Sequence, residues 1–274
     1  MSPADTPLIA VVVPSHDRPL RLRWLLNALA EQTAPAGSFE VLVAHDSRGP
    51  QTDALLAAHP LAVRGTLRAL AFPPGSAGPA QKRNAAWRQA RAAHVLFTDD
   101  DCRPPCGWIA AALAAVAAHP DAIVQGPTSV DPDELVVKLH APHARTQVVE
   151  LPGGEPSLWA QTCNIAYPRA VLETCGGFDE ALPVAAGEDT DLAWRARAAG
   201  TPMVAVPAML THHCVEPASL PARARESWRW QHLPYLTRRH PQIRSSYAGG
   251  GWFWKPQHVR VPFLLGALGL LARG

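Results

Sequence analysis

The stretch VLFTDDD, residues 95–101, joins a short apolar run to three consecutive carboxylates and is soon followed by Pro104 and Pro105. Residues 95–97 suit a buried strand, and ligands of α/β sheets usually bind at the carboxyl ends of such strands. Three adjacent carboxylates repel one another, so a divalent cation such as Mg²⁺ or Mn²⁺, which prefers oxygen ligands, would stabilise them together. A solvated acidic turn is the alternative, because acidic residues are common in turns.

Strand and helix patterns alternate on the N-terminal side of this stretch. Apolar runs and helical spacings predict strands near residues 8–13, 39–44 and 66–71, and helices over residues 22–31, 51–59 and 81–93. A strand, a helix and a second strand form a right-handed unit in a parallel sheet. The alternation therefore predicts an α/β protein with a Rossmann-like, doubly wound and mostly parallel sheet.

The pattern continues beyond the carboxylates with a helix over residues 108–118 and a strand over 122–125. Residues 127–160 show no clear period, and we interpret them as an excursion that lines the site. Glu188 and Asp189 open a further helix, because apolar residues follow them at helical spacing. Two acids in a first helical turn also suit the helix dipole, which is the alternative to a catalytic role.

Composition and charge exclude several classes of protein. The 274 residues are 47% hydrophobic and can bury a sizeable core. Twenty-five basic residues against 23 acidic ones give a net charge of +2, so we expect no nucleic-acid partner. Five cysteines without a CxxC pair argue against a disulfide framework and a zinc knuckle. Residues 1–7 lack a signal-peptide pattern, which predicts a cytoplasmic protein.

Several motifs occur in a fixed order along the chain. They are VVPSHDR at 12–18, VLVAHD at 41–46, KRNA at 82–85, DDD at 99–101, CGGFDE at 175–180, GEDTDLAWR at 187–195 and THH at 211–213. This ordered set resembles the family 2 glycosyltransferases of the GT-A fold. The resemblance implies an inverting, hexosyltransferase-type transfer from a UDP-, GDP- or dTDP-sugar to an acceptor hydroxyl.

The resemblance also implies roles for the three carboxylates and a late histidine. Asp99 would approach the donor ribose, Asp101 would hold Mn²⁺ or Mg²⁺, and Asp100 would share either task. His212 would complete the metal site through a neutral imidazole nitrogen, with His213 as the alternative. A diphosphate leaving group gains negative charge as the glycosidic bond breaks, and a divalent ion with basic side chains can stabilise that charge.

In the family, the acidic pair that opens the later helix supplies the general base. Asp189 would therefore deprotonate the acceptor hydroxyl, with Glu188 beside it to orient the acceptor. We expect Asp191 to support Arg195, four residues later on the same helix.

The donor nucleotide would contact the loop after the first strand and an aspartate after the second strand. The loop residues that the resemblance implies are Pro14, Ser15, His16 and Arg18. Asp46 would accept N–H groups of uracil or of guanine, which the sequence does not separate. Arg83 would contact the nucleotide or its pyrophosphate. The neighbouring Lys82, Arg88 and Arg91 are interpreted as surface charges.

Two residues are expected on the acceptor side. Asn164 matches a family position near the donor sugar, and Trp159 offers a face for sugar stacking, with burial in the core as the alternative. The stretch ESWRW, residues 226–230, resembles the QxxRW element of processive synthases, but Glu replaces Gln and no membrane helices follow. We therefore expect a non-processive enzyme.

The motifs divide the chain into a catalytic domain and an extension. The catalytic domain would cover residues 1–218, with a nucleotide-binding half over about 1–126 and an acceptor half over about 127–218. A helical, Trp- and Arg-rich extension would cover 219–274, including the apolar segment 262–271. Such a composition suits packing onto the catalytic domain or a peripheral contact at the inner face of the membrane.

Two other functions compete with the leading hypothesis. A nucleotidyltransferase would need a Gly-rich phosphate loop directly after the first strand, and residues 14–19 contain no glycine. A catalytically silent nucleotide-sugar-binding module would not need the acids at 101, 188 and 189 or the histidine at 212.

Overall fold

The computed structural model describes residues 6–141, 143–182, 184–222 and 228–246. The chain divides into two compact units, Met1–Trp230 and Gln231–Gly274. Among the described residues, no helix combines the length and the apolar character needed to cross a bilayer. The apolar segment 262–271, on which the expected membrane contact depends, lies outside the described residues.

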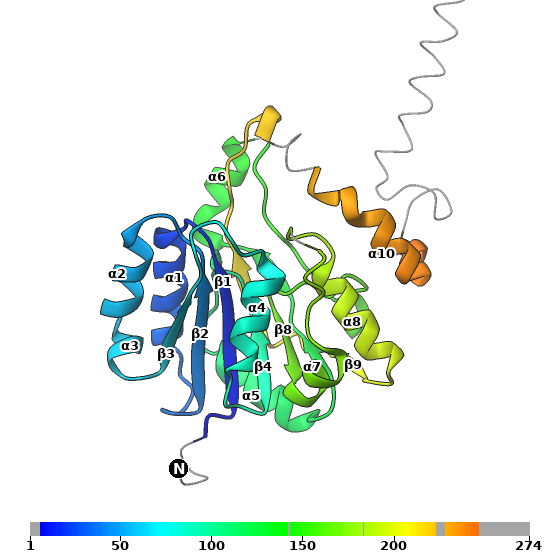
Figure 1. Ribbon diagram of the computed structural model, residues 1–274, viewed down its shortest axis with the longest axis horizontal. Helices are drawn as coiled ribbons and strands as arrows, with labels where there is room; N and C mark the ends of the chain where they lie inside the picture. Colours follow the sequence, from blue (N-terminus) through cyan, green and yellow to red (C-terminus); the bar gives the residue numbers. More distant parts are fainter. Residues whose placement is uncertain (1–5, 142, 183, 223–227, 247–274) are drawn as a thin grey trace, which may run out of the picture. The chain divides into compact units, whose positions relative to one another are not determined.

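A seven-stranded sheet forms the centre of the first unit, in the order β3-β2-β1-β4-β8-β6-β9 (Figure 1). The strands are β1 (Ile9–Ser15), β2 (Phe39–His45), β3 (Leu67–Ala71), β4 (His94–Phe97), β6 (Ile123–Gln125), β8 (Ile165–Pro168) and β9 (Met203–Ala205). Strand β8 runs antiparallel to β4 and β6, and the other neighbouring pairs are parallel. The α/β class and the mostly parallel sheet expected from the sequence are confirmed.

Helices cover both faces of this sheet (Figure 1). One face carries α1 (Pro19–Ala30), α2 (Pro50–Ala58), α3 (Pro60–Val63) and α5 (Trp108–Ala118), and the other carries α4 (Pro79–Arg88), α7 (Arg169–Cys175) and α8 (Glu188–Ala198). Val11 packs into the first layer and Val12 into the second, because successive strand side chains point to opposite faces. A strand buried on both faces must be apolar throughout, which explains the continuous run in β1.

Helix α4 ends at Arg88, before the expected end at residue 93. The backbone N–H groups of Arg91 and Ala92 donate to Oε1 of Glu40 at 2.6 and 3.2 Å, so they cannot continue the helix. Arg91 also donates from Nε to Glu40 Oε2 at 3.0 Å. The Arg91 side chain is 43% exposed, in agreement with its interpretation as a surface charge, although it also pairs with buried Glu40 on β2.

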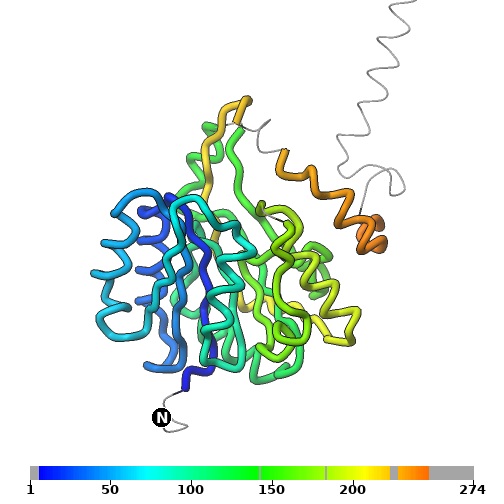
Figure 2. Tube along the Cα trace, in the orientation of Figure 1, coloured from blue at the N-terminus to red at the C-terminus, as the bar shows by residue number. Residues whose placement is uncertain are grey.

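Three short strands form a second sheet, in the order β5-β10-β7. They are β5 (Cys102–Arg103), β10 (Thr211–His213) and β7 (Thr128–Val130). The excursion expected after residue 127 contains η2 (Pro132–Glu134), α6 (Leu135–His140) and η3 (Pro152–Gly154). The backbone trace in Figure 2 shows α6 projecting beyond the edge at which β1 and β2 end.

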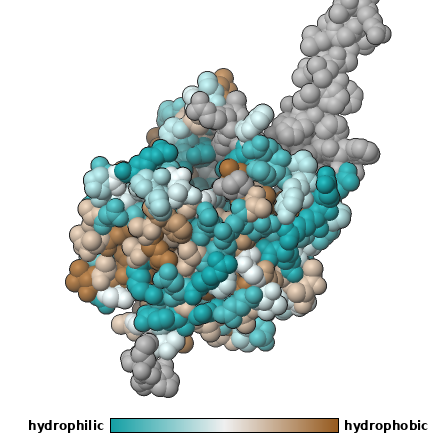
Figure 3. All heavy atoms as spheres, in the orientation of Figure 1, coloured by the Kyte–Doolittle hydropathy of each residue, from teal (hydrophilic) through white to brown (hydrophobic). Residues whose placement is uncertain are grey.

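The last described elements are η4 (Trp228–His232), α10 (Leu233–Arg239) and η5 (Pro241–Ser246), so the extension is helical where the structure describes it. Figure 3 shows mainly hydrophilic side chains over α8, in agreement with a helix that buries one side, including Leu192 and Ala196, against the sheet.

Candidate functional site

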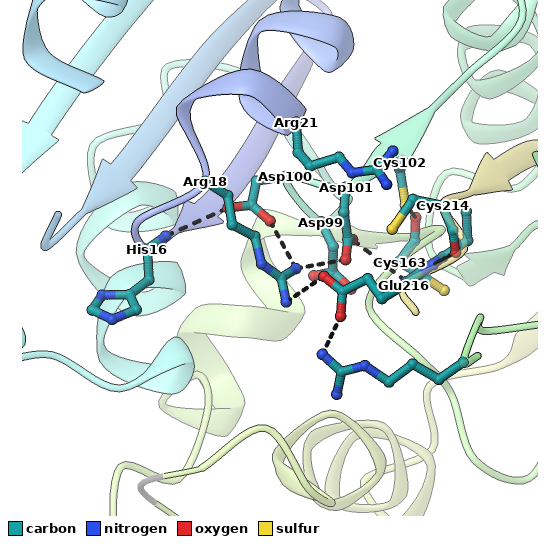
Figure 4. Close-up of polar contacts among 12 residues, drawn as sticks. His16, Arg18, Arg21, Asp99, Asp100, Asp101, Cys102, Cys163, Cys214 and Glu216 are labelled. Atoms are coloured by element: carbon teal, nitrogen blue, oxygen red, sulfur yellow. Dashed lines mark hydrogen bonds and ion pairs between the residues drawn. The ribbon is translucent and has the colours of Figure 1, made fainter. Parts of the chain in front are cut away.

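The loop after β1 and the acidic run after β4 meet at the carboxyl-end edge of the sheet. Ser15 donates from Oγ to Asp100 Oδ2 at 2.7 Å. The backbone N of His16 lies 3.4 Å from the same oxygen, as Figure 4 shows. Pro14 lies just inside β1, opposite Ala44 of β2. Asp100 and Asp101 are only 5% and 8% exposed, so the alternative of a solvated acidic turn is wrong.

Arg18 supplies positive charge to this acidic run. Its NH1 donates to Asp101 Oδ2 at 2.6 Å and lies 3.5 Å from Asp100 Oδ1. Burial and the charge of Asp101 raise the pKa of Asp100 to about 7, against the opposing effects of Arg18 and the Ser15 hydroxyl. The Arg18 guanidinium and the Ser15 hydroxyl offset part of the repulsion on Asp100.

Glu216 is a site residue that the sequence reasoning missed. Its Oε1 lies 2.8 Å from Arg18 NH2, and its Oε2 pairs with Arg145 (Figure 4). Burial alone would raise the pKa of Glu216, but Arg18 and Arg145 lower it overall. The available signal was its position soon after the THH motif that ends at His213.

The structure places His213, rather than His212, beside Asp101. Nε2 of His213 lies 3.4 Å from Asp101 Oδ1, whereas Nδ1 of His212 lies 2.8 Å from Ser129 Oγ on β7. Successive residues of a strand point to opposite sides, so the two histidines cannot face one carboxylate together. The preference for His212 is therefore corrected to the alternative, His213.

Ligands suited to a divalent ion surround Asp101. Among the described residues, two groups of three potential ligand atoms lie within 4.8 Å of one another; they are Asp101, Cys102 and His213, and Asp101, Cys214 and Glu216. Burial and nearby negative charge raise the pKa values of both cysteine thiols. The remaining carboxylate oxygens and imidazole nitrogen fit Mn²⁺ or Mg²⁺ better than a thiophilic metal.

Asp46 lies in a buried polar pocket after β2. Its Oδ1 accepts from Lys82 Nζ at 2.6 Å and lies 2.9 Å from His16 Nδ1, and its Oδ2 accepts from the backbone N of Ala77 at 3.2 Å. Burial would raise the pKa of Asp46, but the hydrogen bonds from Lys82, His16 and Ala77 outweigh it and lower the pKa. Asp46 is thereby held as a carboxylate.

Lys82 is the second residue that the sequence reasoning missed. Its interpretation as a surface charge is wrong, because its side chain is 6% exposed and its ammonium also donates to the backbone oxygen of Ser15 at 3.0 Å. The signal available in the sequence was helical spacing, because Lys82 and the apolar Ala86 are four residues apart and share one side of a helix. In the structure Ala86 is fully buried. Arg88 is the exposed member of this basic helix.

Arg83 is a buried residue between two acidic segments. Its guanidinium donates from NH2 to Asp99 Oδ1 at 2.8 Å and from NH1 to Glu188 Oε1 at 2.7 Å. The side chains of Arg83 and Glu188 are 4% and 3% exposed. Arg83 thus forms a buried bridge between the end of β4 and the start of α8, and its expected contact with the donor stays a prediction.

The acidic pair does open a helix, as the sequence predicts. Gly187 has φ +98° at the N-cap of α8, a left-handed conformation that favours glycine. Burial and the charge of Glu188 raise the pKa of Asp189 to about 7, while Arg83 and the backbone N–H of Thr190 oppose the shift. A carboxyl with such a pKa suits a general base at neutral pH.

Asp191 plays the supporting part expected of it. Arg195 donates from Nε to Asp191 Oδ2 at 2.7 Å across one helical turn, which confirms the prediction.

Asn164 has a structural position rather than a sugar-facing one. Its Nδ2 donates to the backbone oxygens of Pro127, at 2.7 Å, and of Met209. Its Oδ1 accepts from Trp108 Nε1 at 2.9 Å. The amide is buried with all these groups occupied, so the expectation that it contacts the donor sugar is corrected.

Trp159 lies close to the acidic pair. Its backbone oxygen accepts from Thr190 Oγ1 at 2.7 Å, and its ring packs edge-on against Trp230 with the centroids 6.4 Å apart. The Trp159 residue is partly buried, and the sugar-stacking role stays a prediction.

The fold agrees with sequence and structural comparisons. A family model described as glycosyltransferase-like family 2 matches residues 6–232. Validoxylamine A glucosyltransferase of Streptomyces hygroscopicus subsp. jinggangensis is 28% identical over 228 residues, covering 73% of this chain and 54% of the relative. The chain spans about half the length of the curated relatives it matches first.

Solved structures share the fold. Mannosyltransferase PcManGT of Pyrobaculum calidifontis, in complex with GDP-Man and Mn²⁺, gives a TM-score of 0.64 at 20% identity, covering 86% of this chain and 65% of that one. Staphylococcus aureus TarS 1–349, in complex with UDP, gives 0.61 at 22% identity, covering 85% and 71%. The expected GT-A fold is confirmed. Because the family model covers most of the chain, the protein belongs to glycosyltransferase-like family 2.

Proposed function

We propose that this protein is a metal-dependent, inverting and non-processive glycosyltransferase that moves a hexosyl group from a nucleotide-diphosphate sugar to an acceptor hydroxyl. The observation that carries the proposal is that one site contains two acidic groups from different elements. Asp101, after β4, lies 3.4 Å from His213 on β10, while Glu188 and Asp189 come from the start of α8 and Arg83 pairs with both Asp99 and Glu188. The chemistry needs one group for the donor and another for the acceptor.

The pocket around Asp46 would bind the base of the donor nucleotide. Its Oδ2 receives one protein N–H, from Ala77, and a carboxylate oxygen can accept a second. An N–H of uracil, thymine or guanine can supply it. The related structures hold UDP in one case and GDP-Man in another, so we propose a UDP-, dTDP- or GDP-sugar as donor.

Asp101 and His213 would hold Mn²⁺ or Mg²⁺. In the mannosyltransferase structure, Mn²⁺ accompanies GDP-Man. Such an ion supplies positive charge to the diphosphate as it leaves. Arg18, which reaches Asp101 and Glu216 in this structure, carries a further positive charge next to that position.

Asp189 would remove the proton from the acceptor hydroxyl. The acceptor oxygen then attacks the anomeric carbon from the side opposite the diphosphate, the bond to the diphosphate breaks, and the proton stays on Asp189. One displacement of this kind inverts the anomeric configuration. The pKa of about 7 supports the role, because the carboxyl can take up a proton near neutral pH and release it afterwards.

The test is a screen of donor hydrolysis with Mn²⁺, using UDP-, GDP- and dTDP-sugars and water as the acceptor. We expect turnover of at least one donor, loss of turnover with a chelator, and initial release of the inverted anomer, which NMR detects. Binding of a nucleotide-sugar without turnover of any donor, with or without added hydroxyl acceptors, would favour a silent binding module instead. Release of the retained anomer would refute the single displacement.

Location and acceptor also belong to the proposal. We propose a cytoplasmic enzyme without a nucleic-acid partner, and the C-terminal extension as the segment that reaches a peripheral acceptor or the membrane surface. Sedimentation with anionic vesicles, compared between the full chain and a chain ending at residue 258, tests the membrane contact.

A further inference from the structure

Arg83 joins the two acidic groups of the site, although it belongs to neither. One guanidinium nitrogen donates to Asp99, at the end of β4, and another donates to Glu188, at the start of α8. The two bonded carboxylates come from segments 89 residues apart in the chain, since 188 minus 99 is 89. Because a guanidinium is planar and rigid, it fixes the distance between its two partners.

We propose that Arg83 is a positioning residue that couples donor-side Asp99 to the acceptor-side pair Glu188 and Asp189, and that catalysis rather than donor binding depends on it. The inference rests on the proposed function. It differs from the motif-based expectation, in which Arg83 itself touches the donor. Its Nε has no hydrogen-bond partner among the described residues, but the side chain is only 4% exposed and both terminal nitrogens are already paired with carboxylates.

The hydrogen bonds of Glu188 point to a role beyond structural pairing. Its Oε1 is bonded to Arg83, but its buried Oε2 has no hydrogen-bond partner among the residues that the structure describes. Buried carboxylate oxygens in purely structural pairs normally have partners, because an unmade bond is costly. Arg83 therefore holds a carboxylate with one oxygen left for a hydroxyl of a bound sugar.

Charge balance supports the same coupling. Glu188 and Asp99 both disfavour the ionised form of Asp189, and Arg83 is the cation that opposes them. Tyr167 and Cys163 also interact with Asp189, and burial raises the pKa of each, which keeps both neutral. Arg83 thus fixes the position of the acid pair and limits the repulsion within it.

The test compares Arg83→Ala, Arg83→Lys and the control Arg88→Ala. Arg88 lies on the same helix but is half exposed. Calorimetry with UDP or GDP and Mn²⁺ measures nucleotide affinity, and hydrolysis of the donor found in the screen, at saturation, measures turnover. For Arg83→Ala we expect nucleotide affinity within about threefold of the parent and a loss of turnover of about 10²-fold, the scale of a misplaced catalytic group.

Two further readouts separate positioning from a general loss of structure. Added guanidinium chloride at millimolar concentration should restore part of the turnover of Arg83→Ala, and Arg83→Lys should lie between the parent and the alanine variant. The acidic limb of the pH–rate profile should move to higher pH in Arg83→Ala, because Asp189 loses its nearest cation. If Arg83→Ala does not fold, Glu188→Ala removes one arm of the bridge while keeping Arg83, and the same shortfall in turnover with preserved affinity is expected.

Several outcomes overturn the inference. Loss of nucleotide affinity without loss of saturated turnover would return Arg83 to the donor site. Unchanged turnover, or an equal effect of Arg88→Ala, would make the bridge irrelevant to catalysis. A parent protein inactive with all donors would instead overturn the proposed function, and this inference with it.

Discussion

Replacing Lys82 by methionine keeps the aliphatic stem of the side chain and removes its ammonium group. In the native protein that group donates to Asp46 Oδ1 at 2.6 Å and to the Ser15 backbone oxygen at 3.0 Å. Both Lys82 and Asp46 are almost fully buried. The substitution therefore leaves a buried carboxylate without its principal counter-charge.

The expected loss of unfolding free energy is about 3 kcal/mol. Removing one partner of a buried ion pair costs roughly 3–5 kcal/mol, and the lower end applies because two donors remain to Asp46. Those donors are the backbone N of Ala77 and the ring of His16. Urea unfolding of Lys82→Met, Asp46→Asn and the double variant gives the coupling energy between the two residues, which we expect to exceed about 1.5 kcal/mol.

A matched control comes from the same helix. Arg88 is half exposed and lies 3.9 Å from Glu180, so Arg88→Met should change stability by no more than about 0.5 kcal/mol. A coupling energy between Lys82 and Asp46 below about 0.5 kcal/mol would refute the reasoning, because that is the range of exposed pairs. Calorimetry with UDP and GDP on Lys82→Met should also show weakened binding, since the base pocket loses its fixed carboxylate.

Three further predictions concern the metal, the base and acid stability. Asp101→Asn and His213→Ala should each weaken Mn²⁺-dependent UDP or GDP binding, measured by calorimetry, whereas unchanged binding in both, or a larger effect of His212→Ala, would contradict the assignment. Asp189→Asn should retain donor and metal affinity and lower the single-turnover transfer rate by roughly 10²–10⁴-fold; a near-normal rate would move the base elsewhere. The depressed pKa of Asp46 stabilises the fold above the unfolded-state value of about 3.9, and this contribution is lost as the pH falls through the lower folded-state pKa. Urea unfolding followed from neutral pH into that acidic range should therefore show a smaller loss of stability in Asp46→Asn than in the parent.

The sequence was sufficient for the parallel half of the sheet. Strands β1, β2 and β4 are buried on both faces, so each appears as a continuous apolar run between helical patterns. The antiparallel direction of β8 was not predictable in this way. Its four residues, IAYP, are apolar like those of the other strands, and composition carries no information about direction.

The sequence also predicted which acids would gather, but not their partners. Side chains that follow parallel strands meet at one edge, whatever their neighbours, so Ser15, Asp46 and Asp100 could be placed together. Arg83 and Lys82 are adjacent in one helix and have long side chains. Which carboxylate Lys82 contacts and which Arg83 contacts depends on how α4 packs against the sheet. The spacing of the motifs does not predict that packing.

The sequence also did not predict which of the two histidines lies beside Asp101. His212 and His213 are the same residue type in the same strand, and a shift of one residue reverses the side on which a strand side chain lies. The register of β10 against β5 pairs His213 with Cys102, the residue directly after Asp101. The backbone N of Cys214 also donates to the backbone oxygen of Asp101 at 3.0 Å. These main-chain contacts, which no motif encodes, bring His213 to Asp101 and turn His212 toward Ser129.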